Sequence, residues 1–332
     1  MNLEQALQSH RAGDLAAAEG GYRECLQVDP ENTDALYLLG VLRNELGDFD
    51  EAENLVLRAI ALAPEQAQYP LILGGIQLRK GNDDGASASF ERALNLDPNC
   101  AQAYAALGHL ALRAGDPARA ESHFRVGRRI EEDDPAMLLG LGNVYLQRGE
   151  IDNAVKFLSR AAQNNPDDAA IQASLGHALF EQGSHAFAEQ ALRNALRLRP
   201  QLRLARIYLG RSLMRQDRVN SAREEFAALL KIDEQDCGGL LGMGDVANKQ
   251  GHFARAIKFY RRVLVIDSTD SAAALACSAC MERLNDLDGA AQTLRDAMQH
   301  ATTDDQDLPQ ALALLQEKID RRSRIQAPPT ND

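Results

Sequence analysis

The sequence predicts an all-α solenoid of repeated helix pairs, because small residues recur every 34 positions along most of its 332 residues. One column of these positions is mostly glycine: Ala6, Gly40, Gly74, Gly108, Gly142, Gly176, Gly210, Gly244 and Ser278. A second column, twelve positions further along, is alanine throughout: Ala18, Ala52, Ala86, Ala120, Ala154, Ala188, Ala222, Ala256 and Ala290. A small side chain lets a second helix approach closely, whereas a larger one would overpack the contact. Each repeat is therefore expected to be two packed helices.

A turn between the two helices is expected seven positions after the first column. Glycine, which suits a left-handed residue at a helix end, occurs there as Gly13, Gly47, Gly81, Gly115, Gly149, Gly183 and Gly251. The other two repeats have Asp217 and Asn285, which are types that tolerate positive φ. The second helix is then expected to stop before a proline, which is found at Pro30, Pro64, Pro98, Pro166 and Pro200.

These features resemble the tetratricopeptide repeat family, whose 34-residue pattern contains Leu-Gly, an aromatic, an alanine, a second aromatic and a closing proline. Leu141-Gly142 with Tyr145 match the first part of the pattern, and Ala86 with Phe90 match the second. The family's opening tryptophan is absent. The closing proline is replaced in four repeats, by Glu132, Glu234, Ser268 and Thr302. These departures are expected to blur the helix boundaries without changing the fold.

The repeats predict one elongated array over residues 1–304, with about nine units that bury their apolar surface against their neighbours. Residues 305–326 are expected to form a capping helix over the last apolar edge. The basis is the helical spacing of Leu308, Leu312, Leu315 and Ile319. Residues 327–332 are expected to be a disordered tail.

Composition excludes several classes of function. A net charge of -12 opposes binding to nucleic acid or to an anionic membrane, because both need an excess of basic side chains. No apolar run suggests a secretory signal or a membrane span. The five cysteines are an odd number and fit a reducing compartment better than a disulfide framework, so a cytoplasmic location is expected.

No pattern in the sequence predicts a catalytic, cofactor or metal site. Cys277 and Cys280 form a C-x-x-C pair, but Cys277 falls on a column that is leucine in most repeats, so both thiols are interpreted as core. The glycines of 238–244 resemble a phosphate loop, yet they lie inside an expected helix with no preceding strand. The acidic run 131–134 is interpreted as a solvated connection between helices.

A binding surface is expected on the first helix of each repeat, whose fifth, ninth and twelfth positions share a face. The resemblance implies that this face lines a concave groove. The predicted groove residues, with neighbours from thirteenth positions, are Tyr37, Leu71, Leu78, His109, Leu112, Arg113, Leu139, Asn143, Leu146, His177, Phe180, Ile207, Arg211, Met214, Arg215 and Leu241.

One segment of this acidic chain is strongly basic. From Arg193 to Arg223 there are nine arginines against one acid, Asp217, and we call this segment the basic belt. Because Arg211 and Arg215 stand beside apolar groove positions, the partner is expected to be an apolar segment flanked by acidic residues.

The function expected from the resemblance is a noncatalytic scaffold or adaptor that binds a peptide segment or a partner protein in its groove. The alternative is an accessory or regulatory subunit of an enzyme complex, such as a glycosyltransferase or sulfotransferase system. A chaperone adaptor of the family's carboxylate-clamping kind is disfavoured, because lysine is absent from the second, fifth and sixth positions of the first helices. The sequence leaves the oligomeric state open.

Overall fold

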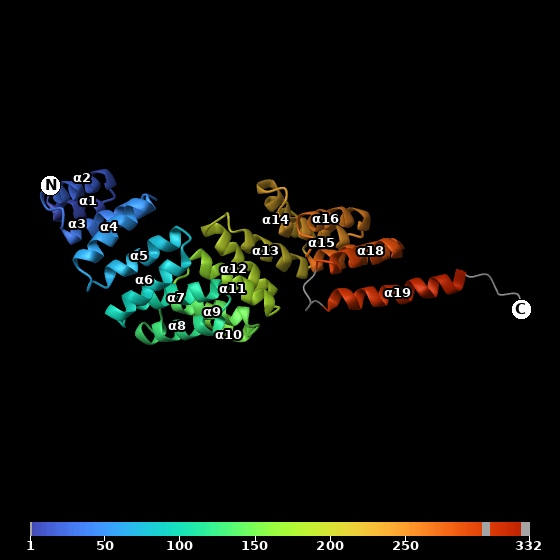
Figure 1. Cartoon of the computed structure of the whole chain (residues 1–332). Helices are drawn as coiled ribbons and strands as arrows, with labels where there is room; N and C mark the ends of the chain where they lie inside the picture. The colour runs from blue at the N-terminus through green and yellow to red at the C-terminus, as the bar shows by residue number, and fades with distance from the viewer. Residues whose placement is uncertain (1, 301–305, 327–332) are drawn as a thin grey trace, which may run out of the picture. The chain divides into compact units, whose positions relative to one another are not determined.

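The computed structural model describes residues 2–300 and 306–326, and within them it has 19 α-helices and no strand. The predicted all-α fold is confirmed. The residues form two compact units, Met1–Asn165 and Pro166–Asp332, each a succession of helices (Figure 1). The predicted disordered tail, residues 327–332, lies outside the described residues.

The first unit contains ten helices, which form five consecutive pairs. They are α1 (Leu3–Arg11), α2 (Leu15–Val28), α3 (Thr33–Glu45), α4 (Phe49–Leu62), α5 (Gln68–Arg79), α6 (Asp83–Leu96), α7 (Ala101–Arg113), α8 (Pro117–Ile130), α9 (Pro135–Gln147) and α10 (Ile151–Asn164).

The second unit contains four further pairs and one longer helix. They are α11 (Ala169–Glu181), α12 (His185–Leu198), α13 (Arg203–Arg215), α14 (Val219–Ile232), α15 (Cys237–Lys249), α16 (Phe253–Ile266), α17 (Ser271–Arg283), α18 (Leu287–Met298) and α19 (Asp307–Gln326). The glycine run that resembles a phosphate loop lies in α15, as the sequence predicts. Helix α19 packs on α18 and α17 and buries Leu308 and Leu315.

The two small-residue columns are where the helices of a pair touch. All nine alanines of the second column have 0% of their surface exposed. A Cβ added at Gly142 would lie 2.4 Å from Cγ of Leu158, and one added at Gly244 would lie 2.3 Å from the Tyr260 ring. The second helix therefore fills the space left by the missing side chain, which confirms the predicted close packing.

The predicted turns are also confirmed. Every glycine of the turn column has positive φ, between 73° at Gly149 and 84° at Gly47 and Gly183. Asp217 and Asn285 take the same left-handed conformation, with φ of 60° and 63°. These two are the only non-glycine residues with positive φ in the described part of the chain.

The expectation that missing prolines blur the helix boundaries is wrong for three of the four repeats that lack the proline. Helices α8, α14 and α16 end at Ile130, Ile232 and Ile266, in register with the ends before proline, whereas α18 ends at Met298, two residues before that register. The next helix begins at a fixed point, because an aspartate caps it. The side chains of Asp134, Asp236 and Asp270 each accept a hydrogen bond from the backbone N–H three residues on. The caps and the packing register set the boundary without proline.

Two adjacent glycines of α5 should respond oppositely to alanine. A Cβ at Gly74 would lie 2.7 Å from the Phe90 ring, whereas nothing lies within 4 Å of one at Gly75. We expect Gly75→Ala to raise the free energy of unfolding by about 0.5–1 kcal/mol through helix propensity. Gly74→Ala is expected to lower it by about 1–3 kcal/mol through overpacking. Urea unfolding of both variants measures the difference, and an equal response would contradict the packing argument.

Candidate partner-binding groove

The predicted groove residues of the first unit lie on α3, α5, α7 and α9, and most are half-buried. Several of these side chains form ring contacts or ion pairs with neighbouring side chains. The Tyr37 ring lies 5.1 Å from the Tyr69 ring, and Arg113 forms an ion pair of 2.9 Å with Asp83. Burial lowers the pKa of His109, whose ring lies 5.1 Å from that of Phe124, so this imidazole favours its neutral form.

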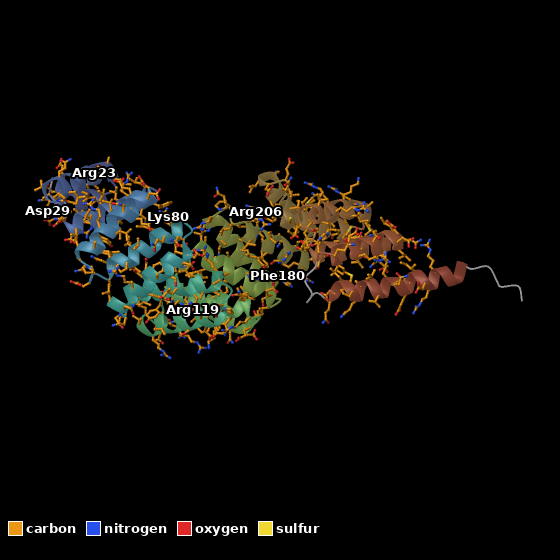
Figure 2. The ribbon with its side chains drawn as sticks, in the orientation of Figure 1. Arg23, Asp29, Lys80, Arg119, Phe180 and Arg206 are labelled. Atoms are coloured by element: carbon orange, nitrogen blue, oxygen red, sulfur yellow. The ribbon has the colours of Figure 1, made fainter. Side chains whose placement is uncertain are left out.

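In the second unit, five of the predicted residues line one cavity of about 970 Å³, which we call the groove cavity. They are Phe180 of α11, which Figure 2 labels, Arg211, Met214 and Arg215 of α13, and Leu241 of α15. Helix α17 adds the small side chains of Ala272 and Ala276 and the long one of Arg283. The cavity is therefore lined by residues from four successive first helices.

An aromatic cluster lies beside the groove cavity. The ring of Tyr208 stacks on that of His177 with centroids 4.0 Å apart, and the Phe180 ring lies 5.6 Å away. The Arg211 guanidinium lies 5.8 Å from the centroid of Tyr208. Burial lowers the pKa of His177, and Arg211 lowers it further, against the opposing effect of Glu181. The cluster is thus an uncharged aromatic surface at neutral pH.

Ile207 is placed differently from the sequence expectation. It is 6% exposed and belongs to the hydrophobic core of the second unit. A Cβ on Gly238 would lie 2.4 Å from its terminal methyl carbon, so the side chain fills the space beside α15. Ile207 therefore supports the wall of the groove and does not present surface to a partner.

The groove cavity has four cationic residues, Arg211, Arg215, Lys249 and Arg283, and a single acidic one among its described lining residues, Asp245. Asp245 accepts a hydrogen bond of 2.8 Å from the Tyr260 hydroxyl. Burial raises the pKa of its carboxyl, while that hydrogen bond and the charges of Arg211 and Arg215 act in the opposite direction. Lys249 forms an ion pair of 3.2 Å with Asp217, so the positive charge of the cavity is carried mainly by Arg211, Arg215 and Arg283.

Sequence reasoning missed Asp245, Lys249 and Arg283, although the signal for them was present. Asp245 stands 34 residues after Arg211, and Lys249 and Arg283 follow Arg215 at one and two such intervals. They occupy ninth and thirteenth positions, whose members we included only as far as repeat seven. Extending the same register by two repeats would have found all three.

Seven of the nine arginines of the basic belt fall into two groups in the structure, and Arg199 and Arg223 belong to neither. Five of its nine arginines form ion pairs with carboxylates: Arg193 and Arg218 with Glu189, Arg197 with Asp167, Arg203 with Asp236 and Arg206 with Glu225. Arg206, labelled in Figure 2, also donates to the Pro200 carbonyl at 3.0 Å. In the described structure no carboxylate pairs with Arg211 or Arg215, and these two line the groove cavity.

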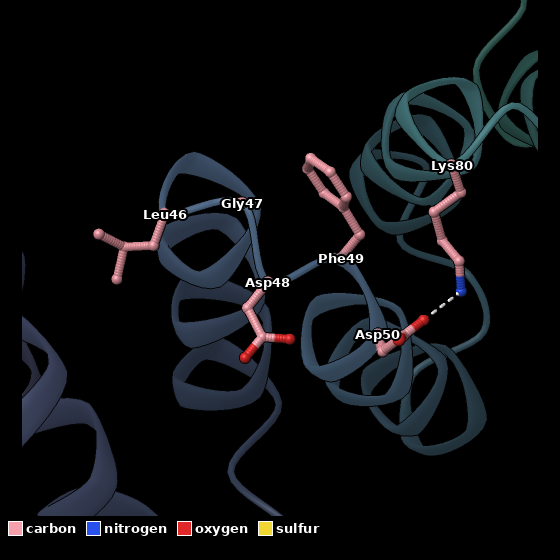
Figure 3. Close-up of a pocket in the computed structure, with 6 residues that line it drawn as sticks. All are labelled: Leu46, Gly47, Asp48, Phe49, Asp50 and Lys80. Atoms are coloured by element: carbon pink, nitrogen blue, oxygen red, sulfur yellow. Dashed lines mark hydrogen bonds and ion pairs between the residues drawn. The ribbon is translucent and has the colours of Figure 1, made fainter.

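A second cavity, of about 540 Å³, lies at the turn between α3 and α4 (Figure 3). The Lys80 ammonium points at the Asp50 carboxylate there, at 2.7 Å, and also contacts Glu53 at 2.6 Å. Lys80, the one cation among the described residues that line this cavity, is already neutralised by two carboxylates of the same unit. This cavity therefore offers a partner less uncompensated charge than the groove cavity does.

Other reactive groups are held in unreactive forms. Burial raises the pKa of Cys277 to about 11, so its thiol is protonated at neutral pH. Cys280 is 1% exposed, and burial raises its pKa as well. Among the described residues, no group of three or more His, Cys, Asp or Glu could hold a metal ion. No helix in the described ranges has the length and apolarity needed to span a membrane.

The substitution Asp245→Asn tests whether burial in the groove raises the pKa of the Asp245 carboxyl. A raised pKa means that this carboxyl binds its proton more tightly in the folded chain than in the unfolded chain. Wild type therefore gains stability as pH falls through that pKa, and this gain is absent at neutral pH. Asp245→Asn keeps an acceptor for Tyr260 and removes the titration. We expect the variant to be the more stable at about pH 7 and its advantage to shrink towards about pH 4. Urea melts across this range measure the difference, and an advantage that grows with acid would contradict the assignment.

Comparison with known proteins gave two family matches. The model of the cilia and flagella-associated protein 70 C-terminal domain, a tetratricopeptide repeat domain, matches residues 1–199. A tetratricopeptide repeat model matches residues 179–238. The search of curated proteins gave no match.

Solved structures show the same fold at low sequence identity. A chain of the APC/C hetero-tetramer Cut9-Hcn1 has a TM-score of 0.65 and 19% identity, over 83% of this chain and 55% of that one, so the present chain spans about half its length. Pseudomonas aeruginosa pilF has a TM-score of 0.54 and 19% identity, over 62% of this chain and 94% of that one. A tetratricopeptide repeat protein from Parabacteroides merdae has a TM-score of 0.52 and 15% identity, over 84% and 97%.

Proposed function

Because the chain belongs to the tetratricopeptide repeat family, we propose that it is a noncatalytic scaffold or adaptor that holds a partner segment in the groove cavity. The observation that carries the proposal is the convergence there of Phe180, Met214 and Leu241 with two arginines, Arg211 and Arg215, that form no ion pair among the described residues. Apolar side chains provide contact area once they are covered, and exposed cations steer an acidic partner to them.

The geometry favours binding over reaction. Catalysis needs a nucleophile or a general acid or base near the operating pH, placed beside a substrate site. The groove cavity offers arginines, a lysine and one carboxylate that is hydrogen-bonded to Tyr260. These groups recognise charge and shape. We place the scaffold in the cytoplasm, which suits its five free cysteines.

Affinity capture from the source cells tests the proposal with a substitution that fills the groove cavity. Ala272 is exposed and lines the cavity, so Ala272→Trp adds bulk there without disturbing the core. Ala118→Trp, at an exposed position of α8, is the matched control. We expect wild type and Ala118→Trp to retain the same proteins and Ala272→Trp to lose them.

The outcome also separates the two functional classes. Several proteins that share a short acidic and apolar motif would support the scaffold. A single catalytic subunit recovered in fixed ratio would instead favour the accessory subunit of an enzyme complex. Unchanged retention by Ala272→Trp would rule out the groove cavity as the binding site.

A further inference from the structure

Helix α16 of the second unit, labelled in Figure 1, carries a set of cations with no acidic residue on the same helix. Arg255, Lys258, Arg261 and Arg262 are all exposed, and the helix contains neither aspartate nor glutamate. Each of the other second helices contains at least one acidic residue. The positive charge of α16 is therefore specific to this helix and does not belong to the repeat pattern.

Three of these cations line one surface cavity of about 640 Å³. Arg255, Lys258 and Arg262 stand three and four residues apart, so they share one face of the helix. Ala254 and Phe259 complete the described lining of the cavity, which includes no carboxylate. We call Arg255, Lys258 and Arg262 the cation face.

The contacts of the cation face leave its charge uncompensated. The Arg255 guanidinium lies 5.8 Å from the centroid of the Phe259 ring. Arg262 donates a hydrogen bond of 2.6 Å to the backbone carbonyl of Glu234. In the described structure none of the three cations forms an ion pair with a carboxylate. Their positive charge is therefore available to a ligand from outside the chain.

The repeat shows why Arg255 has no acidic partner. Four repeats earlier, the equivalent residue Arg119 forms an ion pair of 3.0 Å with Glu91, which lies on the preceding second helix. The residue equivalent to Glu91 is Ala227 of α14. The register that supplies a carboxylate to Arg119 therefore supplies only a methyl group to Arg255.

Arg262 has lost its acidic partner in the same way. Three repeats earlier, the equivalent residue Arg160 forms an ion pair of 2.8 Å with Asp133. The residue equivalent to Asp133 is Gln235. Both arginines of the cation face are thus present while the carboxylates that neutralise their equivalents are absent.

The acidic residues of the neighbouring helices favour a narrow ligand. Asp296 of α18 lines a cavity together with Arg261 of α16, and Glu224 is exposed on α14. A broad anionic surface, such as a membrane or a nucleic acid, would meet these carboxylates as well as the cations, and the net charge of -12 would repel it further. An acidic protein segment can contact the cation face alone.

An exposed apolar side chain adjoins the cation face. Val265 is 86% exposed and stands seven residues after Lys258, so the two share a face of α16. A partner that covers Val265 gains apolar contact area next to the ion pairs. The chemistry of the surface therefore selects acidic residues with an apolar residue beside them.

We propose that the cation face is a second docking surface, which binds an acidic segment of a partner protein with an adjacent apolar residue over Val265. None of its three cations is among the described lining residues of the groove cavity. The inference therefore goes beyond the proposed function, because it gives the scaffold a separate site for a second partner.

A charge reversal on α16 tests the proposal. The probe is a fluorescent peptide with a run of glutamates followed by leucine, and fluorescence anisotropy at low ionic strength reports its affinity. The full-length protein carries Arg211→Glu and Arg215→Glu, so the unpaired arginines of the groove cavity do not contribute. We expect Lys258→Glu to weaken binding about tenfold. Lys156→Glu is the matched control, because Lys156 is exposed at the equivalent position three repeats earlier, and it should leave the affinity unchanged.

Restoring the missing carboxylates provides a second test that removes no cation. Ala227→Glu combined with Gln235→Asp supplies acids at the positions that neutralise arginines in other repeats, so the peptide should again bind about tenfold more weakly. Ala227→Gln combined with Gln235→Asn places uncharged side chains of similar size there and should keep the affinity. Circular dichroism checks that every variant is folded.

Three results would overturn the proposal: no peptide binding at low salt, equal affinity of the Lys258→Glu and Lys156→Glu proteins, or unchanged affinity after the carboxylates are restored. Vesicles of phosphatidylserine and phosphatidylcholine and a double-stranded DNA serve as alternative probes. Binding of either that is tighter than that of the peptide and lost in Lys258→Glu would also overturn it. The proposed function fails separately, if Ala272→Trp retains the captured partners.

Discussion

Replacing Ala154 by glutamate is expected to lower the free energy of unfolding by several kcal/mol. Ala154 is 0% exposed in α10, in the alanine column that packs the two helices of a repeat. A glutamate there must push α9 and α10 apart or bury an unpaired charge, and both are costly. Chemical denaturation followed by circular dichroism measures the loss.

Asn153→Glu is the matched control for this substitution. Asn153 is exposed on the same helix, so the substitution adds the same charge without burial, although it also removes an exposed hydrogen bond of 2.9 Å to Glu150. We expect it to change the unfolding free energy by less than about 1 kcal/mol. If Ala154→Glu were as mild as this control, the small-residue columns would not be the contact that holds each helix pair together.

The second large effect is expected on binding, where apolar and charged groups should act on different rates. Phe180→Ala combined with Met214→Ala should shorten the residence time of a captured partner by about ten- to thirtyfold, because hot-spot contacts govern dissociation. Arg211→Glu combined with Arg215→Glu should slow association by about tenfold at low salt, because exposed charges act mainly on encounter.

Surface plasmon resonance at low and high salt separates the two effects. The charge-reversal effect should fade at about 1 M salt, whereas the effect of the alanine pair should persist. Arg223→Glu controls for the loss of positive charge elsewhere in the basic belt. If the reversals left association unchanged at low salt, the unpaired arginines would not contribute to the site.

The fold was predictable because the residues that contact each other within a repeat stand at fixed separations along the sequence. A glycine such as Gly142 and the residue that fills its space, Leu158, stand at a fixed separation inside one repeat. The same register predicted positive φ at Asp217, because the turn position requires it whatever the residue. Helix ends were less predictable from proline alone, since aspartate caps set them as well.

The site was only partly predictable, because its charges depend on contacts between repeats. Arg218 pairs with Glu189 and Arg203 with Asp236, about one repeat away in each case, and no local pattern marks such pairs. Arg215 forms no such pair among the described residues. The burial of Ile207 depends on Gly238, which leaves space for it in the neighbouring repeat.

Site-specific photo-crosslinking tests the central claim, that a partner occupies the groove cavity, most directly. A photoreactive amino acid replaces Asn248, which is exposed and lines the cavity on α15. In a second variant it replaces Phe187, which is 67% exposed on α12 and outside the cavity. The account predicts that irradiation links the captured partner to position 248 and not to position 187. Linkage at position 187 alone would contradict it.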